Sequence, residues 1–185
     1  MIKNYFFAFL IIFAAVLLSY SVSYSVNQGD KKMDIQVTSP AFDRGEMIPT
    51  EYTCRGDNIS PQLDWENLPE DTESVALIAD DPDAPMKTWV HWVIFNIPVH
   101  EGGLPKNVPS SEKLKNGAIQ GTNSSKKTGY IGPCPPSGTH RYFFKIFALD
   151  KTLNLKSGIK KKDLLKAMKG HILAEGELMG KYKKK

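Results

Sequence analysis

The chain has 185 residues, 24% of them charged and 41% hydrophobic, and its formal net charge at pH 7 is +4. A charge this small does not favour nucleic-acid binding, which normally relies on a strongly basic surface. After an N-terminal leader, the length leaves room for one domain of about 155 to 160 residues with a single hydrophobic core. The sequence shows no internal repeat and no heptad pattern.

Residues 1–26 have the composition of an export signal. Lys3 precedes an uncharged, strongly apolar run over residues 5–18, and the following small residues offer cleavage sites at Ser19, Ser21, Ser23 and Ser25. The uncharged stretch continues to Val26, long enough to span a bilayer as an uncleaved anchor. Both interpretations predict a periplasmic or extracellular domain, because Lys3 keeps the N-terminus in the cytoplasm. We therefore divide the chain into a signal peptide or anchor (1–26), a linker (27–32) and a folded domain (33–185).

The pattern of apolar residues predicts a mainly β domain. In chain order we expect strands over residues 33–39, 61–65, 74–79, 89–97, 118–120, 141–149 and 171–182, and one short amphipathic helix over 161–169. Residues 102–130 otherwise read as a long surface loop. Because strands and helices do not alternate, we expect a β-sandwich or partly closed barrel with peripheral helices, and not a doubly wound fold.

Two cysteines and two groups of lysines need interpretation. In an oxidising compartment the pair Cys54 and Cys134 predicts a disulfide, with two buried free thiols as the alternative. Lysines cluster over residues 160–162 and 181–185. These clusters either contact anionic lipid head groups or are simply a solvated helix start and a frayed C-terminal tail.

Two turn-rich segments carry the candidate chemistry. Asp81 and Asp83 flank Pro82 in a rigid turn, so both carboxylates can reach one small volume. If they crowd together, one retains a proton and can donate to a phosphate, while the ionised one can receive an amine. Such a pair would suit a ligand carrying both groups, such as a phosphoethanolamine head group.

Histidines and a tyrosine lie on the adjoining strands. Strand alternation places His91 on the same face as Trp89 and Val93, and places His140 with Tyr142. Imidazoles and a phenol are the donors that an oxyanion needs, and the backbone N–H groups of the glycine-rich turn, Gly132 and Gly138, can add to them. We therefore expect a preformed pocket for a small anion.

Other kinds of site remain open. His91, His140, Asp81 and Asp83 also form a set that could bind a metal ion. Hydrolysis could use Ser60 or Ser137 as nucleophile with a histidine base, although neither serine lies in a Gly-x-Ser-x-Gly turn. A lone Cys134 nucleophile is a weaker alternative. No glycine-rich nucleotide loop occurs, so we expect no cofactor.

Over nearly all of residues 35–182 the chain resembles the phosphatidylethanolamine-binding protein family, in its bacterial Raf-kinase-inhibitor-like branch. The motifs that carry this resemblance are Ser39-Pro40-Ala41-Phe42, Asn58-Ile59-Ser60-Pro61-Gln62-Leu63-Asp64-Trp65, Asp81-Pro82-Asp83-Ala84-Pro85, Trp89-Val90-His91-Trp92, Gly132-Pro133-Cys134-Pro135-Pro136 and His140-Arg141-Tyr142. They occur in the family's order.

The resemblance implies a β-sandwich of two antiparallel sheets with an anion pocket at its edge. It assigns to that pocket the ligand-binding residues Asp81, Asp83, His91, Gly132, Pro133, His140 and Tyr142. Family members bind phosphate-bearing groups there, and some inhibit kinases or proteases without catalysis. The resemblance therefore favours an exported, non-enzymatic binding protein for a phosphate-bearing small molecule or phospholipid head group, with a protein partner as a further expectation. The alternative is a metal-dependent or histidine-assisted hydrolase.

Two local expectations also follow from the resemblance. It suggests a cis peptide at Ala84-Pro85. In the segment from Asn123 to Gly132 this chain departs from the bacterial pattern, because it reads Ser-Ser-Lys-Lys after the asparagine. We expect that loop to be more basic and more loosely held than in relatives.

Overall fold

The computed structural model of the protein describes residues 35–184. The predicted leader and linker lie outside the described residues. Within residues 35–184 no helix is long and apolar enough to cross a membrane.

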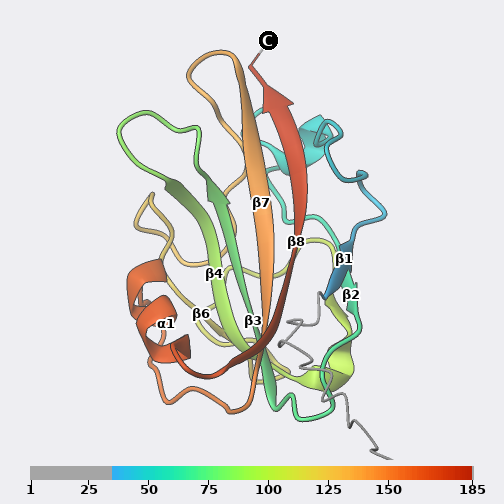
Figure 1. The fold of residues 1–185 in the computed structure, drawn as a ribbon. Helices are drawn as coiled ribbons and strands as arrows, with labels where there is room; N and C mark the ends of the chain where they lie inside the picture. Colours follow the sequence, from blue (N-terminus) through green and yellow to red (C-terminus); the bar gives the residue numbers. More distant parts are fainter. Residues whose placement is uncertain (1–34, 185) are drawn as a thin grey trace, which may run out of the picture. The chain divides into compact units, whose positions relative to one another are not determined.

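The described strands form two antiparallel sheets (Figure 1). The small sheet has the order β1-β2-β5, made of Gln36–Thr38, Leu63–Glu66 and Gly103–Leu104. The large sheet has the order β6-β4-β3-β7-β8, made of Ile119–Gln120, Trp89–Ile97, Ser74–Asp81, Thr139–Leu149 and Ile172–Lys183. The helix α1 spans Lys161–Met168, and two 3₁₀ turns, η1 and η2, span Thr50–Tyr52 and Val99–Glu101. The predicted mainly β sandwich is confirmed.

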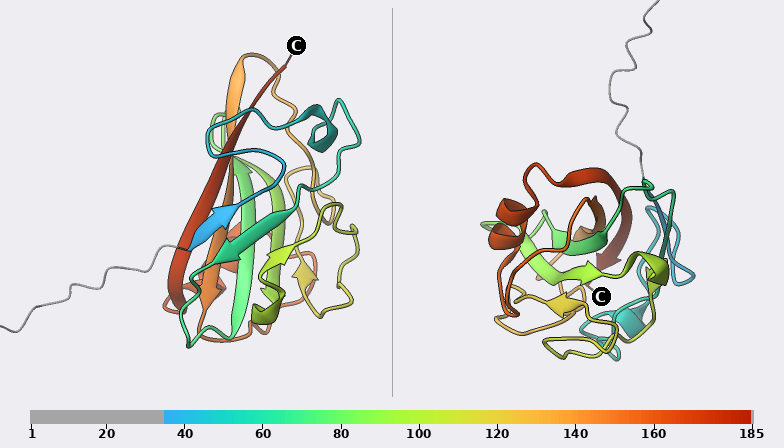
Figure 2. Two further views of the ribbon diagram at one scale, coloured as in Figure 1. Left: turned by 90° about the vertical axis from the view of Figure 1, so that its right-hand side faces the viewer. Right: turned by 90° about the horizontal axis from the view of Figure 1, so that it is seen from below.

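The two faces of the large sheet are covered by different elements. On one face the small sheet encloses a core that includes Trp65, Trp92 and Phe144. On the other face α1 buries Leu164 and Met168 in a second core. Figures 1 and 2 show the small sheet and α1 on opposite sides of the large sheet. The molecule is therefore layered as small sheet, large sheet and helix.

The central strand β3 is buried along its whole length. Val75, Leu77 and Ala79 face the small sheet, whereas Ala76 and Ile78 face α1. A strand covered on both faces needs apolar residues at every position, which explains the continuous apolar run from residue 75 to 79. The run ends in two carboxylates, Asp80 and Asp81.

The ends of the elements differ only slightly from the expected ones. β4 has the predicted bounds, and the helix ends one residue earlier than predicted. The C-terminal lysines differ more, because β8 continues to Lys183 and the backbone of Lys181 bonds to Glu46 and Ile48. The prediction of a frayed tail is therefore wrong for residues 181–183, which the ladder of backbone hydrogen bonds holds in the sheet.

The predicted disulfide is present and closes the wall of a cavity described below. Cys54 and Cys134 are bonded, with their Cα atoms 5.5 Å apart and a sequence separation of 80. The Cys54 N–H also donates to the carbonyl oxygen of Pro133, at 3.1 Å. Nearby, the buried hydroxyl of Tyr130 donates to the Tyr52 carbonyl oxygen at 2.8 Å. These bonds fasten the segment after η1 to the segment that precedes β7.

Replacing both cysteines by serine should lower the free energy of unfolding by about 3 to 4 kcal/mol, because the unfolded chain regains the entropy of a long closed loop. Urea denaturation monitored by fluorescence measures the change. Wild type unfolded in the presence of a reductant is the control and should match the double variant. Equal midpoints for the oxidised wild type and the variant would contradict the stabilising role.

Candidate functional site

A cavity of about 300 Å³ lies where the ends of β3, β4 and β7 meet the loops that follow and precede them. Four residues predicted from the sequence line it, namely Asp81, His91, Gly132 and His140. The remaining lining comes from the turn after β3, from Trp89, Ser125 and Ile131, and from the proline-rich segment that contains Cys134. We call this cavity the histidine pocket.

His140 is held by Asp81 on the neighbouring strand. Its Nδ1 atom lies 2.7 Å from Oδ2 of Asp81, and both side chains are buried. The other oxygen of Asp81 accepts the backbone N–H of Asp83 at 2.8 Å. The carboxylate therefore fixes the imidazole ring of His140 and leaves its Nε2 atom as the nitrogen available to the pocket.

His91 enters the pocket through a bulge in β4. Ala79 pairs with Trp92 and Asp80 pairs with Val90, so His91 is an extra residue in the ladder. Its ring meets the Tyr142 ring edge to face, with the centroids 5.2 Å apart. Val93 instead packs in the core beneath α1. The prediction that His91 and Val93 share a face is therefore wrong, because a bulge shifts the alternation by one residue.

The protonation of His91 follows from its surroundings. The Nδ1 atom lies 2.6 Å from the carbonyl oxygen of Ile131. Because a carbonyl only accepts, Nδ1 carries the hydrogen. Burial lowers the pKa of His91, outweighing the opposing effects of Ile131 and Asp81. His91 is thus a neutral imidazole with a lone pair on Nε2.

Tyr142 packs against His91 and is not among the residues that line the pocket. It is buried, and within the described residues its hydroxyl oxygen makes no direct hydrogen bond. Burial first, and then the nearby Asp81 carboxylate, raise the pKa of the phenol, so the hydroxyl keeps its proton. Tyr142 supports the His91 ring, and its direct contact with a ligand stays a prediction.

Asp83 forms an ion pair with Arg141. Its two carboxylate oxygens accept from Nε and Nη2 of Arg141 at 2.9 and 2.7 Å, and Oδ2 also accepts the Arg141 backbone N–H at 2.9 Å. These hydrogen bonds lower the pKa of Asp83 to about 2. Asp83 is therefore ionised and does not retain the proton considered from the sequence. Its role toward a ligand stays a prediction.

Gly132 lines the pocket, whereas Pro133 is not among the lining residues, so its contact with a ligand stays a prediction. The Gly132 N–H donates to the Oδ1 atom of Asn58 at 2.7 Å, so the donor expected for a ligand is already occupied. A Cβ at this position would lie 2.4 Å from the Tyr52 carbonyl oxygen, which explains the glycine. Two residues that support the site were not predicted from the sequence: Asn58, which accepts from Gly132, and Ile131, whose carbonyl oxygen contacts His91. Neither side chain is of a type or in a pattern that indicates a binding site.

The two candidate nucleophiles lie elsewhere. Ser60 is buried, and its hydroxyl accepts the backbone N–H of Val108 at 2.9 Å, so it holds a loop in place. Ser137 is exposed, and neither serine is among the residues that line the histidine pocket. In the described part of the chain no three acidic, histidine or cysteine side chains are grouped as a metal site would need.

The loops beside the pocket differ from the two local expectations. Between residues 35 and 184 every peptide bond is trans, so the cis prediction at Ala84-Pro85 is wrong; the turn instead bends at Met86, whose φ is 70°. The side chain of Asn123 holds the loop that follows it. The Asn123 Oδ1 atom accepts from the backbone N–H groups of Ser125 and Lys127, and its Nδ2 atom donates to the carbonyl oxygen of Gly129. The loop is basic, as expected, but not loosely held.

The chain is similar to known proteins over most of its length. The family model described as phosphatidylethanolamine-binding protein matches residues 38–183. A UPF0098 protein of Methanothermobacter thermautotrophicus is 56% identical over 142 residues, which cover 77% of this chain and 93% of that protein. A UPF0098 protein of Aquifex aeolicus is 46% identical over 153 residues, covering 81% of this chain and 89% of that protein.

Two crystal structures share the fold. A putative phosphatidylethanolamine-binding protein homologue from Chlamydia trachomatis superposes with a TM-score of 0.76 at 39% identity, covering 82% of this chain and 99% of that one. The second is Escherichia coli YbcL, described as a new member of the mammalian phosphatidylethanolamine-binding protein family. It gives a TM-score of 0.76 at 34% identity, and the match covers 83% of this chain and 100% of YbcL.

The lowered pKa of His91 predicts how stability depends on pH. Its pKa is lower in the folded than in the unfolded chain, so its stabilising contribution is complete above about pH 6.5 and falls below that pH by at most about 1.4 kcal/mol per pH unit. His91→Asn keeps an N–H near Nδ1 but does not titrate. In buffers without phosphate, the difference in unfolding free energy between wild type and His91→Asn should shrink as the pH falls from 8 to 5. Parallel profiles would contradict the assignment.

Proposed function

The chain belongs to the phosphatidylethanolamine-binding protein family, and we propose that its histidine pocket binds the phosphate group of a small molecule or phospholipid head group without catalysis. The observation that carries the proposal is that His91 and His140 are both held by the protein through Nδ1. The Nδ1 atoms of His91 and His140 are occupied by Ile131 and Asp81, at 2.6 and 2.7 Å. Both Nε2 atoms are therefore left for a ligand in the same cavity.

A bound phosphate would change the protonation of this pocket. A neutral imidazole whose Nδ1 carries the hydrogen can only accept at Nε2, whereas an imidazolium donates from both nitrogens. A nearby anion raises the pKa of a histidine, so phosphate and protons should bind together. Asp81 already provides a carboxylate next to His140, and the ligand supplies a negative charge next to His91.

The other groups of the pocket suit the amine of a phosphoethanolamine head group. Asp81 contributes a carboxylate, and Trp89, which lines the same cavity, offers an aromatic face to an ammonium ion. A cavity of about 300 Å³ is near the lower end of the usual range for small-molecule sites. The size and the charges thus favour a head group over a large ligand.

Histidine-assisted hydrolysis is the second candidate, because Asp81 orients His140 as a carboxylate orients a general base. We favour binding, since neither serine considered as a nucleophile lines the pocket. Action on a partner kinase or protease through the pocket rim and the loop over residues 102–130 is a further part of the proposal.

We also propose that the domain is exported by residues 1–26. The disulfide between Cys54 and Cys134 supports this proposal, because structural disulfides persist mainly outside the reducing cytoplasm.

Titration calorimetry with phosphate and with phosphoethanolamine tests the pocket. His140→Ala and Asp81→Ala should each weaken binding at least tenfold, because each removes one half of the Asp81–His140 pair. His171→Ala is the matched control, since His171 makes a similar contact with Asp150 at 2.9 Å on the exposed surface. Binding that is absent in wild type, or equal in all three variants, would overturn the proposal.

The affinity for phosphate should increase as the pH falls from 8 to 6, by up to tenfold per pH unit for each proton taken up. The same samples should release no product from p-nitrophenyl phosphate. Turnover that disappears in His140→Ala but not in His171→Ala would favour the hydrolase instead.

Cell fractionation tests export. The full chain expressed in a bacterial host should be found outside the cytoplasm with both cysteines oxidised, whereas a chain lacking residues 2–26 should stay in the cytoplasm with reactive thiols. Alkylation of the denatured protein measures the thiols. A full chain found in the cytosol with two free thiols would contradict the prediction.

A further inference from the structure

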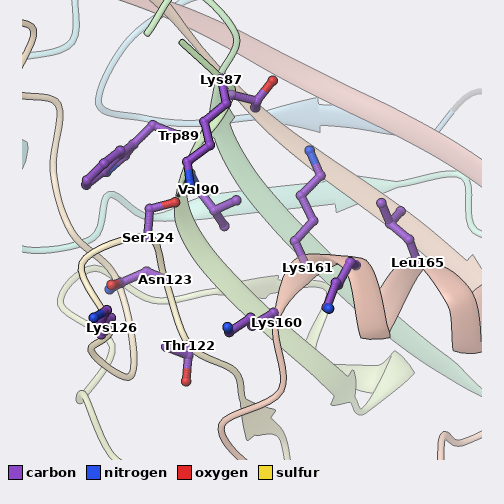
Figure 3. Close-up of a pocket in the computed structure, with 12 residues that line it drawn as sticks. Lys87, Trp89, Val90, Thr122, Asn123, Ser124, Lys126, Lys160, Lys161 and Leu165 are labelled. Atoms are coloured by element: carbon purple, nitrogen blue, oxygen red, sulfur yellow. Dashed lines mark hydrogen bonds between the residues drawn. The ribbon is translucent and has the colours of Figure 1, made fainter. Parts of the chain in front are cut away.

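A second cavity, of about 430 Å³, shares Trp89 with the histidine pocket, and five of the residues that line it are lysines. It is formed by the turn before β4 and the strand's first residues, by residues 122–126 and by the start of α1 (Figure 3). The lysines that line it are Lys87, Lys126, Lys160, Lys161 and Lys162. We call this cavity the lysine cleft.

Most of the charge in the lysine cleft is not neutralised. Lys161 pairs with the buried carboxylate of Asp80. In the described chain the other four lysines form no ion pair, unlike Lys106 and Lys145, which pair with acidic residues. The nearby Asp163 carboxylate accepts the backbone N–H of Lys160 at 3.1 Å. Because the whole chain has a net charge of only +4, four unpaired ammonium groups around one cavity are a strong local concentration.

The walls of the cleft are tied together before any ligand binds. The Val90 N–H donates to the Ser124 hydroxyl at 2.9 Å, and the Ser124 N–H donates to the Val90 carbonyl at 2.9 Å. The Thr122 N–H donates to the carbonyl of Ile159, next to the start of α1, at 2.8 Å. Asp80 fastens α1 itself to the sheet through Lys161. The lysine backbones are therefore held in fixed positions, which reduces the cost of binding a ligand.

We infer that the lysine cleft binds a small organic molecule that carries two or more phosphate or sulfate groups. Lysine ammonium groups bind such anions as point charges, and here they approach from three segments of the chain. Trp89, Val90 and the partly exposed Leu165 supply apolar surface for the carbon skeleton of the ligand. A concave site favours a discrete ligand over a flat membrane. The inference does not depend on the function proposed for the histidine pocket.

Inositol hexakisphosphate is the probe for the test, with uncharged myo-inositol as the comparison. Titration calorimetry on the full chain, purified in a non-ionic detergent, should show binding of the phosphorylated compound alone, weakening as salt is raised. The combined variant Lys87→Gln, Lys126→Gln and Lys160→Gln should reduce the affinity at least tenfold. The combined variant Lys113→Gln, Lys115→Gln and Lys151→Gln removes the same charge from exposed positions outside the cleft and should bind within about twofold of wild type.

Two further measurements separate this site from the rest of the molecule. Thermal unfolding should show that both triple variants fold. His140→Ala should leave inositol hexakisphosphate binding unchanged, and the cleft variant should leave inorganic phosphate binding to the histidine pocket unchanged. The inference is wrong if wild type does not bind inositol hexakisphosphate, or if both triple variants lose affinity equally. It is also wrong if the cleft lysines are needed only for binding of the protein to vesicles of anionic lipid.

Discussion

The structure depends on two adjacent carboxylates at the end of a fully buried strand. Asp80 and Asp81 follow an apolar run in β3, where an unpaired charge would be very costly. Strand alternation sends them to opposite faces, so each needs its own partners. Asp80 meets Lys145 and Lys161 on the helix side, and Asp81 meets His140 on the side of the small sheet. The pairs of Asp80 hold the start of α1, which lines the lysine cleft, against the sheet. The pair of Asp81 orients the His140 ring in the histidine pocket.

Burial also determines which ligand charge the histidine pocket favours. An imidazolium at His91 would be costly while the pocket is empty, and this residue accordingly has a lowered pKa. An anion that enters brings the missing countercharge and stabilises the protonated ring. A cation gains nothing from His91 beyond a lone pair. Under the proposed function, the pocket would thus distinguish ligands by charge through the desolvation of the His91 side chain.

The sequence predicted every strand except β5, which lies in the expected loop over residues 102–130, because buried strands produce apolar runs. It also predicted four of the residues that line the histidine pocket, because rigid turns produce characteristic glycines and prolines. It was insufficient where the outcome depended on contacts between distant segments. The bulge at His91 depends on the register between β3 and β4, and the pairing of Asp83 depends on Arg141, 58 residues away. The order in the loop after Asn123 comes from that asparagine's own side chain, which composition alone does not show.

Trp89 lines both the histidine pocket and the lysine cleft. Trp89 is thus a wall residue common to both cavities. A ligand that shifts this side chain in one cavity also changes the wall of the other, whereas a ligand that leaves it in place does not. Two unlike ligands could therefore affect each other's binding through this one shared residue, although the charged groups that would recognise them belong to separate cavities.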